Sequence, residues 1–174
     1  GGGKQGVTQG AIKGDPDGPG FAVVWSNGTE DGEPDKLYYA MVNANSSGVT
    51  WQVEPRKVFP ASTGTQLGGN IAPLGRGRWL LAYSEHPTDV IKDYLKIYWD
   101  NWAIPEEMRD DGSRVAVVDS TGQVLSGPTD VSALGARFPV EMNHLVLRPQ
   151  GIGWVATDGP GKTTARVALL RCRQ

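Results

Sequence analysis

The chain has 174 residues, of which 39% are hydrophobic and 21% are charged, and these values fit one globular domain with a sizeable core. Its formal net charge of −2 excludes the strongly basic surface that is typical of nucleic-acid-binding proteins, and no apolar stretch approaches the roughly 18 residues of a membrane-spanning helix. The 24 Gly and 12 Pro residues favour many short strands joined by tight turns over long helices.

The first unit of the chain is expected to contain four strands. A short strand around Val7 to Lys13 leads into a Pro/Gly turn at residues 15–20, which lacks the full set of alternating oxygen ligands of a calcium loop. The next segment, Phe21 to Asn27, is nearly continuously apolar, a pattern typical of a strand buried on both faces. Two more strands are expected at Leu37 to Asn43 and at Thr50 to Phe59, the second with the alternating pattern of an outer strand.

The second unit repeats this arrangement but carries a long insertion. Its four strands are expected at Asn70 to Leu74, Arg78 to Glu85, Arg114 to Asp119 and Gln123 to Val131. The insertion at residues 85–112 separates the second strand from the third. Without this insertion the repeat length is roughly 45 to 55 residues, the range that is expected of propeller blades.

The third unit is expected to hold three strands, at Asn143 to Leu147, Ile152 to Thr157 and Ala165 to Cys172, with no fourth strand after them. Cys172 is the single cysteine of the chain, which rules out an internal disulfide. At the end of an apolar run it is expected to be a small buried hydrophobe rather than a reactive thiol. The three units together are predicted at residues 7–59, 66–131 and 140–174.

Two sequence patterns recur in all three units. The segments that begin at Phe21, Trp79 and Gly153 read as variants of one strand. Each is followed by a strand in which one alanine lies between larger apolar residues, and these alanines are Ala40, Ala116 and Ala168. This pattern resembles, over nearly the whole chain, the blades of a bacterial β-propeller of the sialidase-like or kelch-like kind. The resemblance implies an all-β fold with three four-stranded antiparallel blades. No Asp-box of the sialidase type is present, so the resemblance implies no sialidase activity.

The long connections of the chain are expected to gather at one end of the sheets. In an antiparallel meander, the connections after the second and fourth strands lie at the same end, and here these are residues 26–35, 59–69, 85–112 and 132–142. Loops on a rigid scaffold commonly carry binding function, so this end is the predicted ligand-binding face. Acidic residues crowd it, which indicates either a solvated acidic rim or a surface for cations and polyhydroxyl ligands.

The insertion is expected to contain a short amphipathic helix within Pro87 to Met108. Thr88 is its expected N-cap, and apolar or aromatic residues recur three or four positions apart at Ile91, Tyr94, Leu95, Tyr98 and Trp102. These side chains either pack the helix onto the sheets or stay partly exposed and stack on a sugar ring or on an apolar patch of a partner. The sequence favours His86 as a satisfied structural histidine, and the alternative is a ligand contact. The predicted ligand-binding residues are Glu85, His86, Tyr94, Tyr98, Trp99 and Trp102.

The sequence contains no nucleophile motif, metal-ligand cluster or carboxylate pair with a distinctive spacing. This favours a non-enzymatic module that binds a protein or a carbohydrate, with no catalytic residue, metal site or cofactor. The alternative is part of a propeller-fold glycoside hydrolase or a related hydrolase, whose acidic residues come from several blades and leave no local motif.

The predicted number of blades also bears on partners. Three blades are fewer than the roughly four to eight of a closed propeller, so the ring is expected to be completed by another copy of the chain or by another fragment of the same precursor. The chain begins at Gly1 without Met, which indicates a processed product. Glycosylation-type triplets at Asn27 and Asn45 favour a secreted or periplasmic location.

Overall fold

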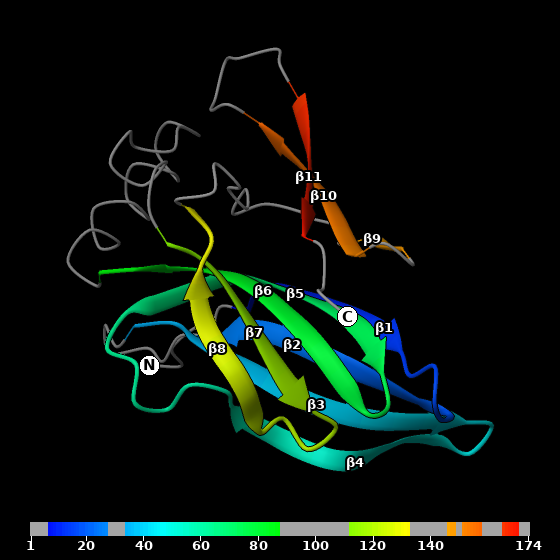
Figure 1. Ribbon diagram of the computed structural model, residues 1–174. Helices are drawn as coiled ribbons and strands as arrows, with labels where there is room; N and C mark the ends of the chain where they lie inside the picture. The colour runs from blue at the N-terminus through cyan, green and yellow to red at the C-terminus, as the bar shows by residue number, and fades with distance from the viewer. Residues whose placement is uncertain are drawn as a thin grey trace.

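The computed structural model describes residues 7–27, 34–87, 112–132, 146–148, 151–157 and 165–170. These residues form eleven β-strands and no α-helix, so the expectation of an all-β fold is confirmed (Figure 1). Within the same ranges no helix is long and apolar enough to cross a membrane. The amphipathic helix expected in the insertion lies outside the described residues.

Sheet A is the first four-stranded antiparallel sheet, and its strands lie in chain order. It consists of β1 (Val7–Gly14), β2 (Gly20–Asn27), β3 (Lys36–Asn45) and β4 (Gly48–Lys57). The turn expected between β1 and β2 is confirmed, because the backbone N–H of Asp15 donates to the carbonyl oxygen of Gly20 over 2.8 Å. The Asp15 side chain also accepts a 3.0 Å hydrogen bond from the backbone N–H of Asp17, which stabilises the turn locally.

Sheet B is the second four-stranded antiparallel sheet, and its strands also lie in chain order. It consists of β5 (Thr65–Gly75), β6 (Arg78–His86), β7 (Ser113–Asp119) and β8 (Val124–Asp130). The insertion connects β6 to β7. Sheets A and B therefore correspond to the first two units that the sequence predicts.

Strand β5 begins earlier than expected. The sequence predicts a connection over residues 59–69, but β5 already starts at Thr65. The strand continues through an irregularity between Leu67 and Asn70, where Gly68 has a φ of 65°. Glycine adopts this left-handed conformation without a steric cost, so Gly68 allows the strand to continue through the irregularity.

Sheet C is smaller and contains β9 (Val146–Arg148), β10 (Gly151–Thr157) and β11 (Ala165–Leu170) in the order β11-β10-β9. Three four-stranded blades are therefore not shown, because the described part of the third unit holds three strands, as expected for this unit. Strand β11 lies at the edge of sheet C, and no described strand pairs with its outer edge. Sheets A and B lie against each other without closing into a ring (Figure 1).

In the third unit, the observed strand pairing is shifted by one residue relative to the predicted repeat. Phe21 and Trp79 each pair with the residue two positions after the recurring alanine of the next strand. In sheet C the same place belongs to Ile152, not to Gly153 as the sequence predicts. A shift of one residue moves every side chain of a strand to the other face of its sheet, so the pairing decides which face of sheet C corresponds to which face of sheets A and B.

The hydrophobic core lies between sheets A and B. Strand β5 packs across β1, β2 and β3, and burial of each large apolar side chain contributes roughly 1.5 to 3 kcal/mol. The Tyr39 hydroxyl also donates to the carbonyl oxygen of Ser120 over 3.2 Å, so a hydrogen bond joins the two sheets as well. The buried core side chains are Ala22, Val24, Leu37, Tyr39, Met41 and Val58 of the first unit with Ile71, Trp79, Leu81, Tyr83 and Val118 of the second.

The prediction that β2 is buried on both faces is wrong. Its burial alternates, because Ala22 and Val24 face sheet B and are buried, whereas Val23 and Trp25 on the opposite face are only half-buried. Strand β6 has the doubly buried pattern instead, and Leu80 on its face away from sheet A is only 5% exposed. Strand β6 is therefore buried on both of its faces, whereas β2 is buried only on the face toward sheet B.

Candidate functional site

The described ends of the strands that carry the long connections meet at one end of sheets A and B, here called the loop end. Strands β3, β5 and β7 begin there, and β2, β4, β6 and β8 finish there. The side chain of Gln66 in β5 accepts a 2.9 Å hydrogen bond from the backbone N–H of Leu37 in β3. The backbone N–H of Gln66 donates to the carbonyl oxygen of Asp35 over 2.8 Å. The predicted convergence of the strand ends is therefore confirmed.

Lys36 holds the connection between β4 and β5 against this end. Its ammonium group donates to the carbonyl oxygens of Ser62 over 2.6 Å and of Gly64 over 2.9 Å. Earlier in the same connection, Phe59 stacks on Tyr83 of β6 with 5.2 Å between ring centroids. A charge-assisted hydrogen bond is roughly twice as strong as a neutral one, so Lys36 fixes this connection in one place.

Glu85, near the end of β6, joins sheet B to the connection between β4 and β5 at the loop end. Its Oε1 accepts hydrogen bonds from the Ser62 hydroxyl and, over 3.3 Å, from the Gln66 side-chain amide. Its Oε2 lies 3.8 Å from Nε of Arg114 in β7. The Glu85 side chain is 20% exposed, so the carboxylate is anchored and still reaches solvent.

Arg114 lies between two carboxylates. Besides Glu85, its guanidinium group contacts the Asp130 carboxylate at the end of β8, which is 49% exposed. Asp130 also accepts a 2.8 Å hydrogen bond from the backbone N–H of Ser132. These two donors, first the Ser132 backbone and then Arg114, hold the pKa of Asp130 below its usual value. Asp130 is therefore a fixed anion at neutral pH.

The remaining polar groups beneath the loop end are more buried. Burial raises the pKa of Asp35, which precedes β3, and burial also raises the pKa of Tyr83. The Tyr83 hydroxyl and the Thr65 hydroxyl are buried and have no hydrogen-bond partner among the described residues. The loop end thus combines one fixed anionic centre with buried groups that favour their neutral forms. The loop-end cluster, as the name is used below, is Lys36, Ser62, Gln66, Glu85, Arg114 and Asp130.

The structure describes two of the six predicted ligand-binding residues. Glu85 belongs to the loop-end cluster, and His86 follows it at the end of β6, where its side chain is 3% exposed and its backbone pairs with Thr65. His86 is therefore buried at the end of β6, where Glu85 is partly exposed. The other four predicted residues lie in the insertion, outside the described residues, and are Tyr94, Tyr98, Trp99 and Trp102.

Five members of the cluster were not predicted from the sequence, and they are Lys36, Ser62, Gln66, Arg114 and Asp130. They are polar residues in or near predicted loops, and such residues are usually solvated. The position of Arg114 directly after the insertion was the one available signal. Its carboxylate partners come from two other strands, and the local sequence does not encode that pairing.

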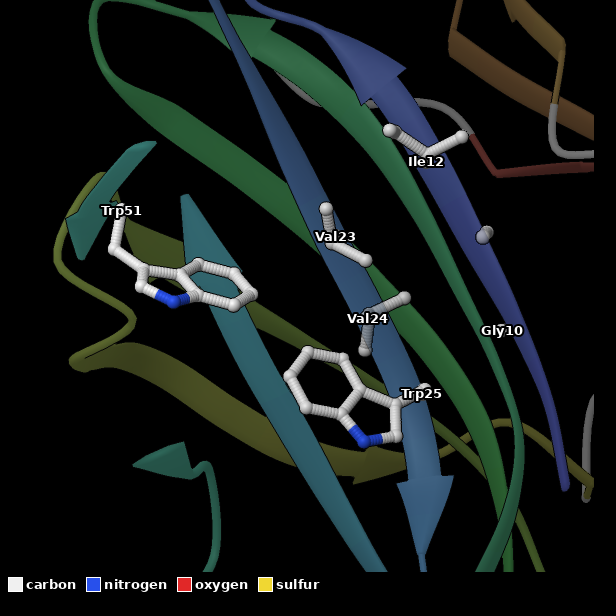
Figure 2. Close-up of a pocket in the computed structure, with 7 residues that line it drawn as sticks. Gly10, Ile12, Val23, Val24, Trp25 and Trp51 are labelled. Atoms are coloured by element: carbon white, nitrogen blue, oxygen red, sulfur yellow. The ribbon is translucent and has the colours of Figure 1, made fainter. Parts of the chain in front are cut away.

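A second site, also not predicted, lies on the face of sheet A that points away from sheet B. It is a hollow of about 500 Å³, and Figure 2 shows the indole rings of Trp25 and Trp51 beside it. Trp25 stacks on Tyr38 with 5.6 Å between ring centroids, and Trp51 is 51% exposed. Every residue of its lining is apolar or glycine, which suits binding by burial of apolar surface and offers no acid or base. The lining residues are Gly10, Ala11, Ile12, Val23, Val24, Trp25 and Trp51.

The chain was also compared with known proteins. No family model, no curated protein sequence and no solved structure matches it.

Proposed function

We propose that this chain is a non-enzymatic binding module of the β-propeller kind, which takes a carbohydrate or protein ligand at the loop end. The observation that carries the proposal is the loop-end cluster, in which Glu85 links β6 to the β4–β5 connection, to β5 and to β7. This cross-linked base holds the points from which the long connections leave. A rigid base lowers the entropic cost of binding.

The exposed atoms of the cluster suit a polyhydroxyl or polar ligand. Glu85 and Asp130 offer carboxylate oxygens that accept hydrogen bonds from hydroxyl or amide groups, and Arg114 offers donors between them. Their side chains are 20%, 49% and 27% exposed, so a ligand can reach them without unfolding the strand ends. In this proposal Tyr94, Tyr98, Trp99 and Trp102 of the insertion add apolar faces for stacking on a sugar ring, and His86 stays buried at the end of β6.

The test of this proposal is binding to a glycan array and to candidate protein ligands, followed by substitution of the cluster. Glu85→Gln should weaken binding at least about tenfold, equivalent to about 1.4 kcal/mol, because the amide loses the charge that faces the ligand. The melting temperature should change little, since the contact with Arg114 is partly exposed and such pairs contribute at most about 1 kcal/mol.

Glu54→Gln is the matched control, because Glu54 is exposed on β4 and lies outside the cluster. It should leave the affinity unchanged. If Glu85→Gln and Glu54→Gln bind equally well, the ligand does not use the loop-end cluster and the proposal fails.

Trp102→Ala separates the two roles considered for the insertion. Loss of affinity with an unchanged melting temperature supports ligand contact, and loss of stability supports packing.

A second candidate is part of a propeller-fold hydrolase. It is favoured by the opposite pKa shifts of two carboxyl groups at the loop end, since the pKa of Asp35 is raised by burial and that of Asp130 is lowered by its donors. Such a divergence is typical of acid and base pairs in enzymes. Turnover of any of a panel of chromogenic glycosides, lost in Asp35→Asn, would replace the binding proposal with this one.

A further inference from the structure

The two four-stranded sheets present equivalent faces. In sheet A, Ile12 of β1 pairs with Val23 of β2, and in sheet B, Ile71 of β5 pairs with Leu81 of β6. The next strand of each sheet brings its recurring alanine opposite Val23 and Leu81. A glycine precedes each isoleucine by two positions. Ile12 and Val23 therefore occupy the places that Ile71 and Leu81 occupy in sheet B.

The equivalent faces differ in what covers them. Ile71 and Leu81 are fully buried because they pack against sheet A. Ile12 is 58% exposed, and Trp51 on the same face is 51% exposed. Together with Trp25 they border the apolar hollow of about 500 Å³ (Figure 2). Contiguous apolar patches on a protein surface commonly mark interaction sites, and here the chain itself shows what covers the equivalent face of sheet B.

In sheet A, the side chains that cover sheet B flank the recurring alanine. Tyr39 and Met41 lie on either side of Ala40 and are buried against sheet B. Sheet C offers the same arrangement around Ala168, since Val167 and Leu169 lie on either side of it in β11. The difference is that these two side chains are exposed.

The register of sheet C shows that the exposed face with Val167 and Leu169 corresponds to the face of sheet A that packs on sheet B. Ala168 pairs with Trp154 in β10, as Ala40 pairs with Val23 in β2. Val167 is 80% exposed and Leu169 is 45% exposed. Sheet A therefore exposes a face whose equivalent in sheet B is buried against sheet A. Sheet C exposes a face whose equivalent in sheet A packs on sheet B.

We infer that the outer face of sheet A, formed around Ile12, Trp25 and Trp51, is a docking surface for sheet C of a second copy of this chain. The Val167 and Leu169 side chains of the partner sheet then cover Ile12 and enter the apolar hollow. The contact is head-to-tail, because the two surfaces that meet are different, and such contacts close into rings or extend into filaments. The inference rests on the repeating-sheet architecture of the proposed function but not on its ligand.

Two single variants test the docking surface by size-exclusion chromatography with light scattering. The wild-type chain should show a concentration-dependent species above the 18.6 kDa of one copy. Ile12→Glu and Val167→Glu should each lose that species, because each would bury a charge in an apolar contact. Leu125→Glu is the control, since Leu125 is 53% exposed on β8 and belongs to neither surface. Its mass profile should match the wild type.

Mixing the two variants gives the sharper result. Ile12→Glu retains an intact sheet C and Val167→Glu retains an intact outer face of sheet A, so a mixture should form a species of two copies and nothing larger. If identical faces of two copies met instead, mixing the two variants would restore no association. That result overturns the inference. Val167→Thr, which nearly conserves the shape of an exposed side chain, checks that lost association does not reflect misfolding and should weaken association in the same direction.

The outcomes separate this inference from the proposed function. A wild-type chain that stays at 18.6 kDa at all concentrations overturns the inference, whether or not it binds a glycan. A result in which Ile12→Glu loses association but Val167→Glu does not also overturns it, because another surface then covers sheet A. Glu85→Gln should leave the association unchanged, and Ile12→Glu should leave ligand binding within about twofold of the affinity that the wild-type chain shows per copy.

Discussion

Two carboxyl groups at the loop end respond to their surroundings in opposite directions. Hydrogen bonds from the Ser132 backbone and from Arg114 favour the charged form of Asp130 and lower its pKa. Burial disfavours the charged form of Asp35 and raises its pKa. Folding therefore gains from ionisation of Asp130 and loses from ionisation of Asp35.

These shifts predict opposite effects of two nearly isosteric substitutions. The stability that Asp130 contributes is present above the unfolded pKa of about 3.9 and is lost as the pH falls through its lower folded value. Asp130→Asn should therefore lower the free energy of unfolding at pH 7. The contribution of Asp35 is present below the unfolded pKa and is lost as the pH rises through its higher folded value, so Asp35→Asn should raise the free energy of unfolding at pH 7.

Urea denaturation measured between about pH 3 and pH 7 checks both signs. The difference between Asp130→Asn and the wild type should shrink toward the acid end, where the wild-type carboxyl is protonated too. A stabilising effect of Asp130→Asn at pH 7, or a destabilising effect of Asp35→Asn, contradicts the assignment of the two carboxyl groups.

Among the elements, β5 makes the closest approach to sheet A. At Gly69, a Cβ would lie 2.6 Å from Cδ1 of Leu37 and 3.2 Å from Cγ2 of Val24. Both neighbours are fully buried, so neither side chain has free space into which it can turn. The absence of a side chain at this position lets β5 lie directly on β2 and β3.

Gly69→Ala should therefore destabilise the fold by about 1 to 3 kcal/mol, the usual cost of overpacking a core. Gly14→Ala is the matched control, because Gly14 is an exposed strand glycine whose added Cβ would meet only ordinary contacts of 3.9 Å or more with Phe21. Chemical denaturation of both variants gives the comparison. Equal stability of the two variants would contradict this argument. It would mean that sheets A and B move apart at Gly69 at no cost in free energy.

For the whole molecule, burial predicts which strands open last. Strand β6 is central in sheet B and buried along nearly its whole length, whereas β8 is an edge strand with mostly exposed side chains. Local opening is least favourable where most apolar surface would be uncovered. The β6 amides from Trp79 to Tyr83 should exchange with deuterium at least about tenfold more slowly than the hydrogen-bonded amides of β8.

Hydrogen exchange followed by mass spectrometry checks this order at one pH and temperature. The hydrogen-bonded amides of β3 provide the reference within sheet A, since β3 is also central but has one partly exposed face. Protection of β8 equal to that of β6 would show that sheet B opens as one unit, and the burial argument would then be wrong.

The candidate site was only partly predictable from the sequence. The position of Glu85 at the end of an apolar strand and before a long insertion is a local signal, and it predicts that Glu85 lies at the loop end. The contacts of Glu85 with Gln66 and Arg114 depend on which strands pair. A polar residue at a strand end has many possible partners, and pairing between strands far apart in the chain selects among them.

The sequence by itself determined that the described part of the chain is all-β, that the first two units each hold four strands, and that the long connections leave from one end. Alternating polarity, turn residues and antiparallel order are local properties, so they can be read without the fold. Only the tertiary structure decided that Phe21 to Asn27 has one buried face rather than two, and that Trp25 and Trp51 border an apolar hollow. The physical reason is that a strand encodes its two faces, while the sheet that packs on each face comes from elsewhere in the chain or, as we infer, from a second copy.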